Sequence, residues 1–186
     1  LNHFAAVRSN GLIANKLKKG DELVAASVSG PEDDVIVVTE GGQAIRFAVG
    51  ALRAASRSSG GVRAVHLNPG DRVMAMSVTR PEAHILIVTV HGYGKCTPVS
   101  RYRPQSRGGM GIKSISISPK SGGVAAARVV DPSDGELMIL STRGVIIRLP
   151  MESVPIQGRI RKGASLMRLD EDDEVASIAV MSQSGP

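Results

Sequence analysis

Short apolar runs that end at a hydroxyl residue and a turn recur three times along the chain. The segments VIVVTEGGQAIRF (35–47), ILIVTVHGYGKCTP (85–98) and LMILSTRGVIIRLP (137–150) share this pattern, with a second run after the turn. Val and Ile are abundant and long periodic helical stretches are absent, so the pattern predicts β-hairpins. The glycines that end the turns, Gly42, Gly92 and Gly144, lie 50 and 52 residues apart.

A basic, small-residue loop follows each hairpin and provides a second set of landmarks. These loops read SRSSGGV (56–62), QSRGGMGI (105–112) and QGRIRKGA (157–164), and VRSNGLI (7–13) is an earlier partner. Their closing glycines, Gly11, Gly61, Gly111 and Gly163, are spaced by 50, 50 and 52 residues. Two independent landmarks with one period indicate a structural repeat.

Each loop is followed by two further predicted strands with a polar turn between them. The first set is LIANKL (12–17), VRAVHL (62–67), IKSISI (112–117) and SLMRL (165–169), and the second is LVAASV (23–28), VMAMSV (73–78), VAAARVV (124–130) and VASIAV (175–180). One unit of about four strands is too small to bury both of its faces alone. Neighbouring sheets that pack around an axis solve this problem, which predicts an all-β, propeller-like fold.

The repeats divide the chain into the blades of a single domain. We expect one domain over residues 1–180, with a partial blade at about 1–30, blades at 35–80, 85–130 and 137–180, and a tail at 181–186. A closed ring does not normally begin within a blade. The chain is therefore expected to form either an incomplete ring or a set of blades that exchange strands.

Composition favours a cytoplasmic segment of a longer protein. Apolar residues make up 42% of the chain, but two Phe, two Tyr and no Trp leave an aliphatic core. The single cysteine, Cys96, excludes an internal disulfide and a cysteine-rich metal site, which fits a reducing setting. No apolar run approaches the roughly 18 residues of a membrane span. The N-terminus LNHFAAVRSN has neither a signal-peptide layout nor an initiator Met, as expected of a cut within a longer protein.

Charge is sorted along the chain into alternating windows. The formal net charge is +6 and the pI about 9.9. All 17 acids fall within 21–40, 71–82, 131–152 and 170–174. The other windows, 1–20, 41–70, 83–130 and 153–169, carry 19 of the 23 bases. Basic segments that recur with the repeat indicate a polyanionic partner.

The basic loops are therefore candidate phosphate-binding elements. Lys and Arg displace the counterions condensed on duplex DNA, and a glycine-rich loop lets backbone N–H groups approach an anion. The candidate residues are Arg57, Arg107, Arg159, Arg161 and Lys162, supported by Arg53, Arg63, Lys95, Arg101, Arg103 and Lys113. No recognition helix, zinc finger or aromatic platform is predicted, so binding is expected to be independent of base sequence. The alternative is that these are solvated loop bases and that the glycines only serve turn geometry.

These repeats resemble those of a known family. ILIVTVHGYGKCTPVSRYRPQSRGGMGIKSI and LMILSTRGVIIRLPMESVPIQGRIRKGASLMRL are similar to the repeat in the C-terminal domain of the DNA gyrase A protein, and the likeness runs from about residue 1 to 180. The resemblance implies a β-pinwheel, a propeller-like disc whose blades exchange strands. It also implies wrapping of double-stranded DNA in support of negative supercoiling by a type II topoisomerase. The implied partners are DNA, the rest of gyrase A and the gyrase B protein, with no cofactor, no metal, no membrane and no catalysis in this segment.

The hallmark box of that family, QRRGGKG, has a counterpart in this chain. The family carries the box in the first of about six blades. Here the nearest sequence is Gln105, Ser106, Arg107, Gly108, Gly109, Met110 and Gly111. Ser106 and Met110 replace an Arg and a Lys, so the segment resembles a degenerate copy, and the full box is expected upstream of Leu1. A topoisomerase IV protein shares the fold with more degraded repeats, and the regular spacing here favours gyrase.

Other sites are weaker interpretations of the same sequence. GYGKCT (92–97) lacks a glycine and the hydroxyl residue of a P-loop, because Thr89 and Cys96 occupy those places. The four His lie far apart without metal-ligand spacing, and no convergent acids indicate an enzyme. A propeller-type protein-interaction module remains an alternative, but such a module is expected to carry apolar or aromatic loop tips, whereas the tips here are Arg, Gly and Ser.

Overall fold

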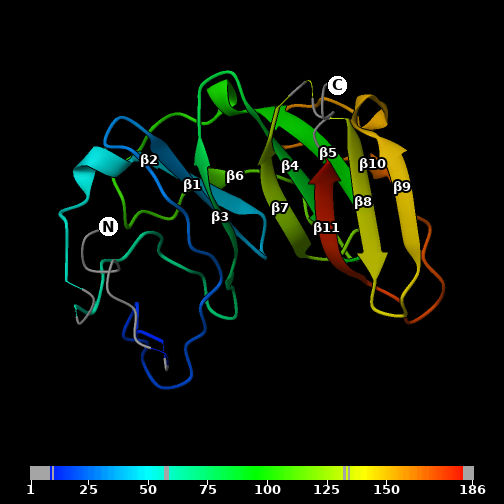
Figure 1. Ribbon diagram of the computed structural model, residues 1–186. Helices are drawn as coiled ribbons and strands as arrows, with labels where there is room; N and C mark the ends of the chain where they lie inside the picture. Colours follow the sequence, from blue (N-terminus) through cyan, green and yellow to red (C-terminus); the bar gives the residue numbers. More distant parts are fainter. Residues whose placement is uncertain (1–8, 10, 57–58, 132, 134, 182–186) are drawn as a thin grey trace.

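The protein is described from a computed structural model, in which residues 9, 11–56, 59–131, 133 and 135–181 are placed well enough to describe. The described residues form eleven strands and three short 3-10 turns, with no α-helix among them. The predicted all-β fold is therefore confirmed. Figure 1 shows three sheets that follow one another across the molecule, from β1 and β2 in blue to β8 and β9 in yellow.

Three hairpins form where the apolar runs predict them. They pair β1 (Asp34–Thr39) with β2 (Gln43–Ala48), β4 (His84–Thr89) with β5 (Tyr93–Pro98), and β8 (Glu136–Ser141) with β9 (Ile146–Pro150). The recurrent hydroxyl residue stabilises each turn, since Thr39, Thr89 and Ser141 accept a side-chain hydrogen bond from the backbone N–H four residues later, at 3.3, 3.2 and 3.1 Å. This contact explains why Thr or Ser ends every first run.

A third strand completes the inner side of each sheet. The strands β3 (Val73–Thr79), β7 (Val124–Val130) and β11 (Val175–Met181) pair antiparallel with the first strand of each hairpin. They are the last strands predicted for each repeat, and β7 contacts both β3 and β11 (Figure 1). The inner strands therefore lie together, as the blades of a propeller require.

The fourth strand of a sheet comes from the next repeat. The short strand β6 (Ile112–Lys113) pairs with β2, and β10 (Ala164–Ser165) pairs with β5. The strand orders are β3-β1-β2-β6, β10-β5-β4-β7 and β11-β8-β9. Blades therefore exchange strands, as the resemblance implies, and among the described residues the third sheet has three strands.

The closing glycines make this exchange possible. Gly111 and Gly163 adopt φ angles of 74° and 84°, which L side chains rarely adopt. A Cβ atom on Gly111 would lie 2.5 Å from the Ala44 oxygen, and one on Gly163 would lie 2.6 Å from the Gly94 oxygen. Only glycine lets the donated strand approach its host so closely, which explains the second landmark of the repeat.

Several predicted strands are absent or shorter than expected. No strand forms over 12–17, 23–28 or 62–67, and β6 and β10 cover only two residues each. The ladder beyond β6 ends because the N–H groups of Ser114 and Ile115 both donate to the Gly42 oxygen. Residues 12–28 pair with no strand of the described chain, and an isolated strand without a partner is not stable.

Two of the three apolar clusters of described residues lie between the sheets and surround β4. Ile85 and Ile87 of β4 pack with Ile36 and Val38 of the first sheet. The alternate residues of the same strand, Leu86 and Val88, pack instead against residues that include Leu137 and Ile139 of the third sheet. Because β4 is buried on both faces, its sequence is continuously apolar rather than alternating.

Candidate nucleic-acid interface

The basic loops at 105–112 and 157–164 are described along their whole length. In each, an arginine side chain forms the same hydrogen bond to the preceding repeat. Arg107 Nη1 donates to the backbone oxygen of Arg63 at 3.5 Å, and Arg159 Nη1 donates to the backbone oxygen of Lys113 at 3.0 Å. Arg107 and Arg159 are equivalent positions in successive repeats, as are Arg63 and Lys113. Each loop arginine is therefore held beside a base of the preceding repeat, and the arrangement recurs one blade later.

Backbone hydrogen bonds attach each loop to the preceding repeat. In the degenerate box, Gly108 N donates to Ala64 O at 2.7 Å, and Gly109 O accepts from His66 N at 2.8 Å. Gln105 N donates to the oxygen of Arg46 at 2.8 Å. Ser106 is exposed, and the side chain of Met110 is 54% exposed. The box is therefore an ordered loop whose variable positions face solvent.

Most of the predicted bases are available to a ligand. Arg159 is half-buried, and the exposed ones are Arg53, Arg63, Arg101, Arg103, Arg107, Lys113, Arg161 and Lys162. In the part of the chain that the structure describes, the three ion pairs involve Arg46, Arg72 and Arg148, none of which belongs to the predicted set. Arg57 lies outside the described residues. The exposed bases therefore keep their charge unpaired by carboxylates there, as a phosphate-binding surface requires.

Lys95 is a correction to the predicted set. Its side chain is fully buried, and Nζ donates to the backbone oxygens of Ser114, Gly158 and Arg159 at 2.9, 2.7 and 2.8 Å. Burial, and then the charge of Arg159, lower the pKa of Lys95 to about 8. An ammonium whose three donors are used inside the protein cannot contact a duplex. Lys95 instead joins β5 to the basic loop of the third repeat.

Arg46 connects the first sheet to the second repeat, as Lys95 connects the second sheet to the third. It was not predicted as a site residue. It pairs with Asp34 of the same sheet at 2.6 Å. Its Nη1 donates to the oxygens of Val99 and Tyr102, in the second repeat, at 3.3 and 3.2 Å. We call the contact of the first sheet with residues 99–115 the first junction, and that of the second sheet with residues 151–167 the second junction. A charged residue between apolar neighbours on a buried strand was the signal that could have identified Arg46.

A tyrosine strengthens the first junction. The hydroxyl of Tyr102 forms a hydrogen bond of 2.6 Å with Ser114 Oγ, and both residues are fully buried. Burial raises the pKa of Tyr102. Tyr102 packs in one cluster with Ile36 and Val38 of the first sheet, so it is part of the packing between blades.

Acidic turns in the repeats have structural roles. Asp173 accepts hydrogen bonds from Thr142 Oγ1, Arg143 N and Glu174 N at 2.8, 3.0 and 2.9 Å. Hydrogen bonding, with the Ser141 side chain as the largest cause, lowers the pKa of Asp173 to about 2. Asp71 takes the equivalent place in the first repeat and accepts from Gly41 N at 2.8 Å. These carboxylates hold hairpin turns, which explains part of the separation of acids from bases.

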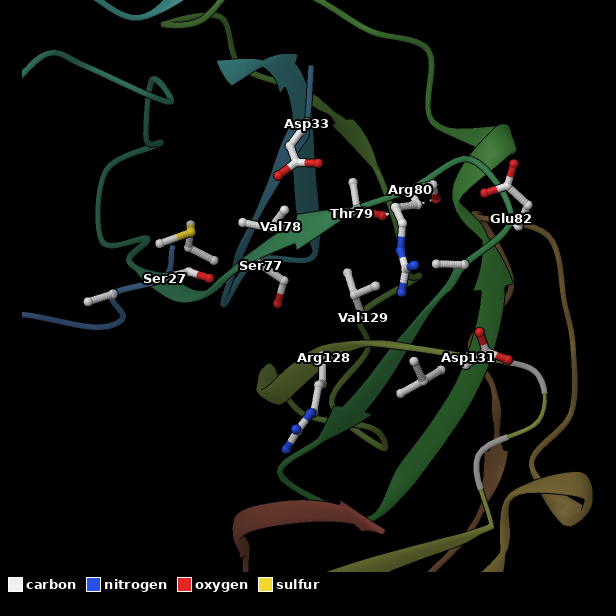
Figure 2. Close-up of a pocket in the computed structure, with 14 residues that line it drawn as sticks. Ser27, Asp33, Ser77, Val78, Thr79, Arg80, Glu82, Arg128, Val129 and Asp131 are labelled. Carbon is white, nitrogen blue, oxygen red and sulfur yellow. Dashed lines mark hydrogen bonds between the residues drawn. The ribbon is translucent and has the colours of Figure 1, made fainter. Parts of the chain in front are cut away.

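A large cleft among the described residues is not lined by the basic loops. It has a volume of about 1040 Å³ and lies among β3, β7 and residues 26–27. Figure 2 shows Arg80 pointing into the middle of the cleft and Arg128 pointing away from Arg80, with Asp33, Glu82 and Asp131 around the lining. Its charges are mixed and none of the predicted bases lines it, so the cleft does not continue the candidate interface.

Two further findings limit the chemistry of the described residues. They contain no helix with the length and apolar character needed to cross a membrane. They also bring together no group of three or more His, Cys, Asp or Glu that could hold a metal ion.

Sequence comparison places this architecture among known proteins. The family described as DNA gyrase C-terminal domain, β-propeller, matches residues 1–29, 33–80, 83–131 and 135–181. The DNA gyrase A protein of Dehalogenimonas lykanthroporepellens is 41% identical over 187 residues, covering 97% of this chain and 23% of that protein. The gyrase A protein of Halalkalibacterium halodurans is 52% identical over 179 residues, covering 96% of this chain and 21% of that protein. The chain thus spans less than a quarter of the length of these relatives.

Solved structures give the same assignment. A DNA gyrase A C-terminal domain superposes with a TM-score of 0.84 at 28% identity, covering 92% of this chain and 58% of that one. The C-terminal domain of a DNA topoisomerase IV shares the fold, with a TM-score of 0.89 at 18% identity, and covers 97% of this chain and 56% of that one. The family match extends over all four repeats. The chain therefore belongs to the family of DNA gyrase C-terminal domains.

Proposed function

We propose that this domain binds duplex DNA through its basic loops, without base specificity, and wraps the duplex in support of negative supercoiling. The observation that carries this proposal is the recurrence of one arrangement, Arg107 beside Arg63 and Arg159 beside Lys113, at successive junctions. Bases repeated at a constant interval can contact successive phosphates of a curved duplex. Bending a short site costs on the order of 1–6 kcal/mol, and several such contacts are needed to offset it.

The parent we propose is the A protein of a DNA gyrase, an ATP-dependent type II topoisomerase that acts with gyrase B in the cytoplasm. Identities of 41% and 52% to gyrase A proteins support this choice. A topoisomerase IV C-terminal domain is the alternative parent, but that likeness, at 18% identity, reflects the fold alone. Strand cleavage and ATP hydrolysis are assigned to other parts of that enzyme.

A salt titration tests the proposed binding. Affinity for duplex DNA, measured by gel shift, is expected to fall with salt at a log–log slope of about −0.9 per phosphate neutralised. Arg107→Ala and Arg159→Ala are each expected to reduce that slope by about one unit. Arg72→Ala is the matched control, because Arg72 is exposed but paired with Glu40 at 3.0 Å. A salt-independent affinity, or no binding at low ionic strength, contradicts the proposal.

A protein-interaction role is the second candidate, and one observation favours it. Met110 and Ile160, near the tips of the two loops, are 54% and 68% exposed. Exposed apolar side chains of this size are typical of protein interfaces. Under this alternative, Met110→Ser and Ile160→Ser abolish the capture of a partner protein and leave the salt slope for DNA unchanged.

A further inference from the structure

The backbone of the first junction is repeated at the second. Position 46 of β2 corresponds to position 96 of β5, and both form a parallel bridge to the next repeat, at Pro104 and Ile156. The oxygens of Arg46 and Cys96 accept from Gln105 N and Gln157 N, both at 2.8 Å. The 3-10 turns η3 (Val99–Arg101) and η4 (Met151–Ser153) precede these contacts in equivalent places.

The side chains at the two junctions differ where the backbones agree. At the first junction, the guanidinium of Arg46 lies between Asp34 and the oxygens of Val99 and Tyr102. At the second junction the equivalents of Arg46 and Asp34 are Cys96 and His84. A much shorter side chain therefore stands where the first junction has an arginine.

A cavity of about 320 Å³ occupies this region of the second junction. His84 and Cys96 line it from the second sheet, and Met151, Glu152 and Val154 line it from the third repeat. Met151 and Val154 are the counterparts of Val99 and Tyr102, and Val154 N donates to Met151 O at 3.0 Å, as Tyr102 N donates to Val99 O at 2.9 Å. The carbonyl groups that receive Arg46 at the first junction therefore have counterparts at the second.

The polar groups around the cavity are suited to accept hydrogen bonds. His84 Nδ1 is buried and has no hydrogen-bond partner among the described residues. Glu152 and Asp131 add carboxylates to the lining. Asp131 also borders the larger cleft, where Arg80 lies (Figure 2). Of the two carboxylates, only Glu152 lines this cavity without also lining the larger cleft. A ligand that donates several hydrogen bonds and carries a positive charge complements this lining.

We propose that the cavity at the second junction binds a small guanidinium-type cation, in the place that the Arg46 head group takes at the first. The planar cation donates to the oxygens of Met151 and Val154 and to His84 Nδ1, in the tautomer that carries its proton on Nε2. Glu152 and Asp131, both in the lining, supply the counter-charge. The volume exceeds that of a bare guanidinium, so an alkyl substituent fits towards Pro155 and Ile156.

Titration of the whole chain with methylguanidinium, followed by amide NMR, tests the proposal. We expect saturable shifts at His84 and at residues 151–156, whereas urea, the neutral molecule of the same shape, gives none. Free arginine shares the head group, and its Kd relative to methylguanidinium distinguishes an amino acid from a simple alkylguanidine as the occupant. Equal responses to methylguanidinium and urea overturn the proposal.

Two variants show whether the response comes from this cavity. Cys96→Arg places the ligand's head group on the chain, as in the first repeat, and is expected to abolish binding, whereas Cys96→Ala keeps the cavity and retains it. If Cys96→Arg does not fold, His84→Leu is the alternative, with an expected rise in Kd of about tenfold for the lost acceptor. Wild-type affinity in a folded Cys96→Arg or in His84→Leu excludes the cavity as the site.

Discussion

The first and second junctions differ in the cation that crosses them and in what that cation reaches. Arg46 crosses the first junction and binds the oxygens of Val99 and Tyr102, at the turn that follows β5. Lys95 crosses the second junction from the adjacent position of its strand and reaches further along the chain, to Gly158 and Arg159 of the basic loop. At the first junction the residue equivalent to Lys95 is Ile45, which is fully buried in an apolar cluster.

This difference shows that the two junctions meet one structural requirement with different residues. Each junction must connect a sheet to a loop that has little secondary structure of its own, and a buried cation does so by satisfying several carbonyl groups at once. At the second junction Cys96 takes the place of the arginine. The buried cation there is Lys95, and a cavity lies beside Cys96. The basic loop of the third repeat is therefore the one whose position depends on a buried ammonium.

Removing the cation of the first junction is expected to have the largest effect. Arg46→Met leaves Asp34 without its partner, in a region where the two side chains are only 10% and 18% exposed. It also removes the Arg46 hydrogen bonds to the oxygens of Val99 and Tyr102, of which the Val99 oxygen still accepts from Tyr102 N. Loss of one partner of a buried pair typically lowers the free energy of unfolding by about 3–5 kcal/mol. Urea denaturation monitored by circular dichroism measures the change.

Arg148→Met is the matched control for this substitution. Arg148 occupies the same position of the third sheet and pairs with Glu136, but its side chain is 63% exposed. An exposed pair contributes about 0–1 kcal/mol. Equal losses of stability in the two variants would show that the first junction does not depend on the burial of Arg46.

Removing the cation of the second junction is expected to have a smaller and more local effect. Lys95→Met keeps most of the side-chain volume and removes the Nζ hydrogen bonds to the oxygens of Ser114, Gly158 and Arg159. The Gly158 oxygen still accepts from Arg161 N. The free energy of unfolding is expected to fall by about 1–3 kcal/mol. Hydrogen exchange should accelerate over residues 157–163 and stay unchanged over 105–111, where no lysine is involved.

The exposed Lys113 provides the control for this experiment. Lys113→Met also removes one positive charge, so it separates a general effect of charge from the loss of the buried hydrogen bonds. Faster exchange spread evenly over both basic loops of Lys95→Met would contradict a local role for Lys95.

The parts of the fold that depend on local sequence were predictable. The hairpins follow from apolar runs, and their turns follow from Thr39, Thr89 and Ser141 with the glycines after them, because those contacts lie within a few residues. The last strand of each repeat was predicted for the same reason. The pairing of β6 with β2 and of β10 with β5 was available only from the resemblance, because it joins segments of different repeats.

The candidate site divides in the same way. Basic loops with closing glycines are visible in sequence, and most of their bases are exposed as a DNA-binding surface requires. Lys95 was assigned to that surface wrongly, because a lysine after a glycine-rich turn has the same local signature whether it faces solvent or the interior. What decides its position is the loop of the next repeat, more than sixty residues away.

The pH dependence of the second junction is the smallest of these effects. In the folded protein, burial and Arg159 lower the pKa of Lys95 from 10.5 to about 8, and in the unfolded chain the amine regains its ordinary pKa. Between these two values the unfolded chain binds more protons, so the contribution of Lys95 to stability increases as the pH rises through this window. The free energy of unfolding of the wild type, relative to Lys95→Met, is therefore expected to be larger at pH 10 than at pH 7.5. Urea titrations at both pH values measure this change. For Lys113→Met, the difference in free energy of unfolding from the wild type should not change with pH. If the difference for Lys95→Met also did not change with pH, the ammonium would be as stable in the junction as in water.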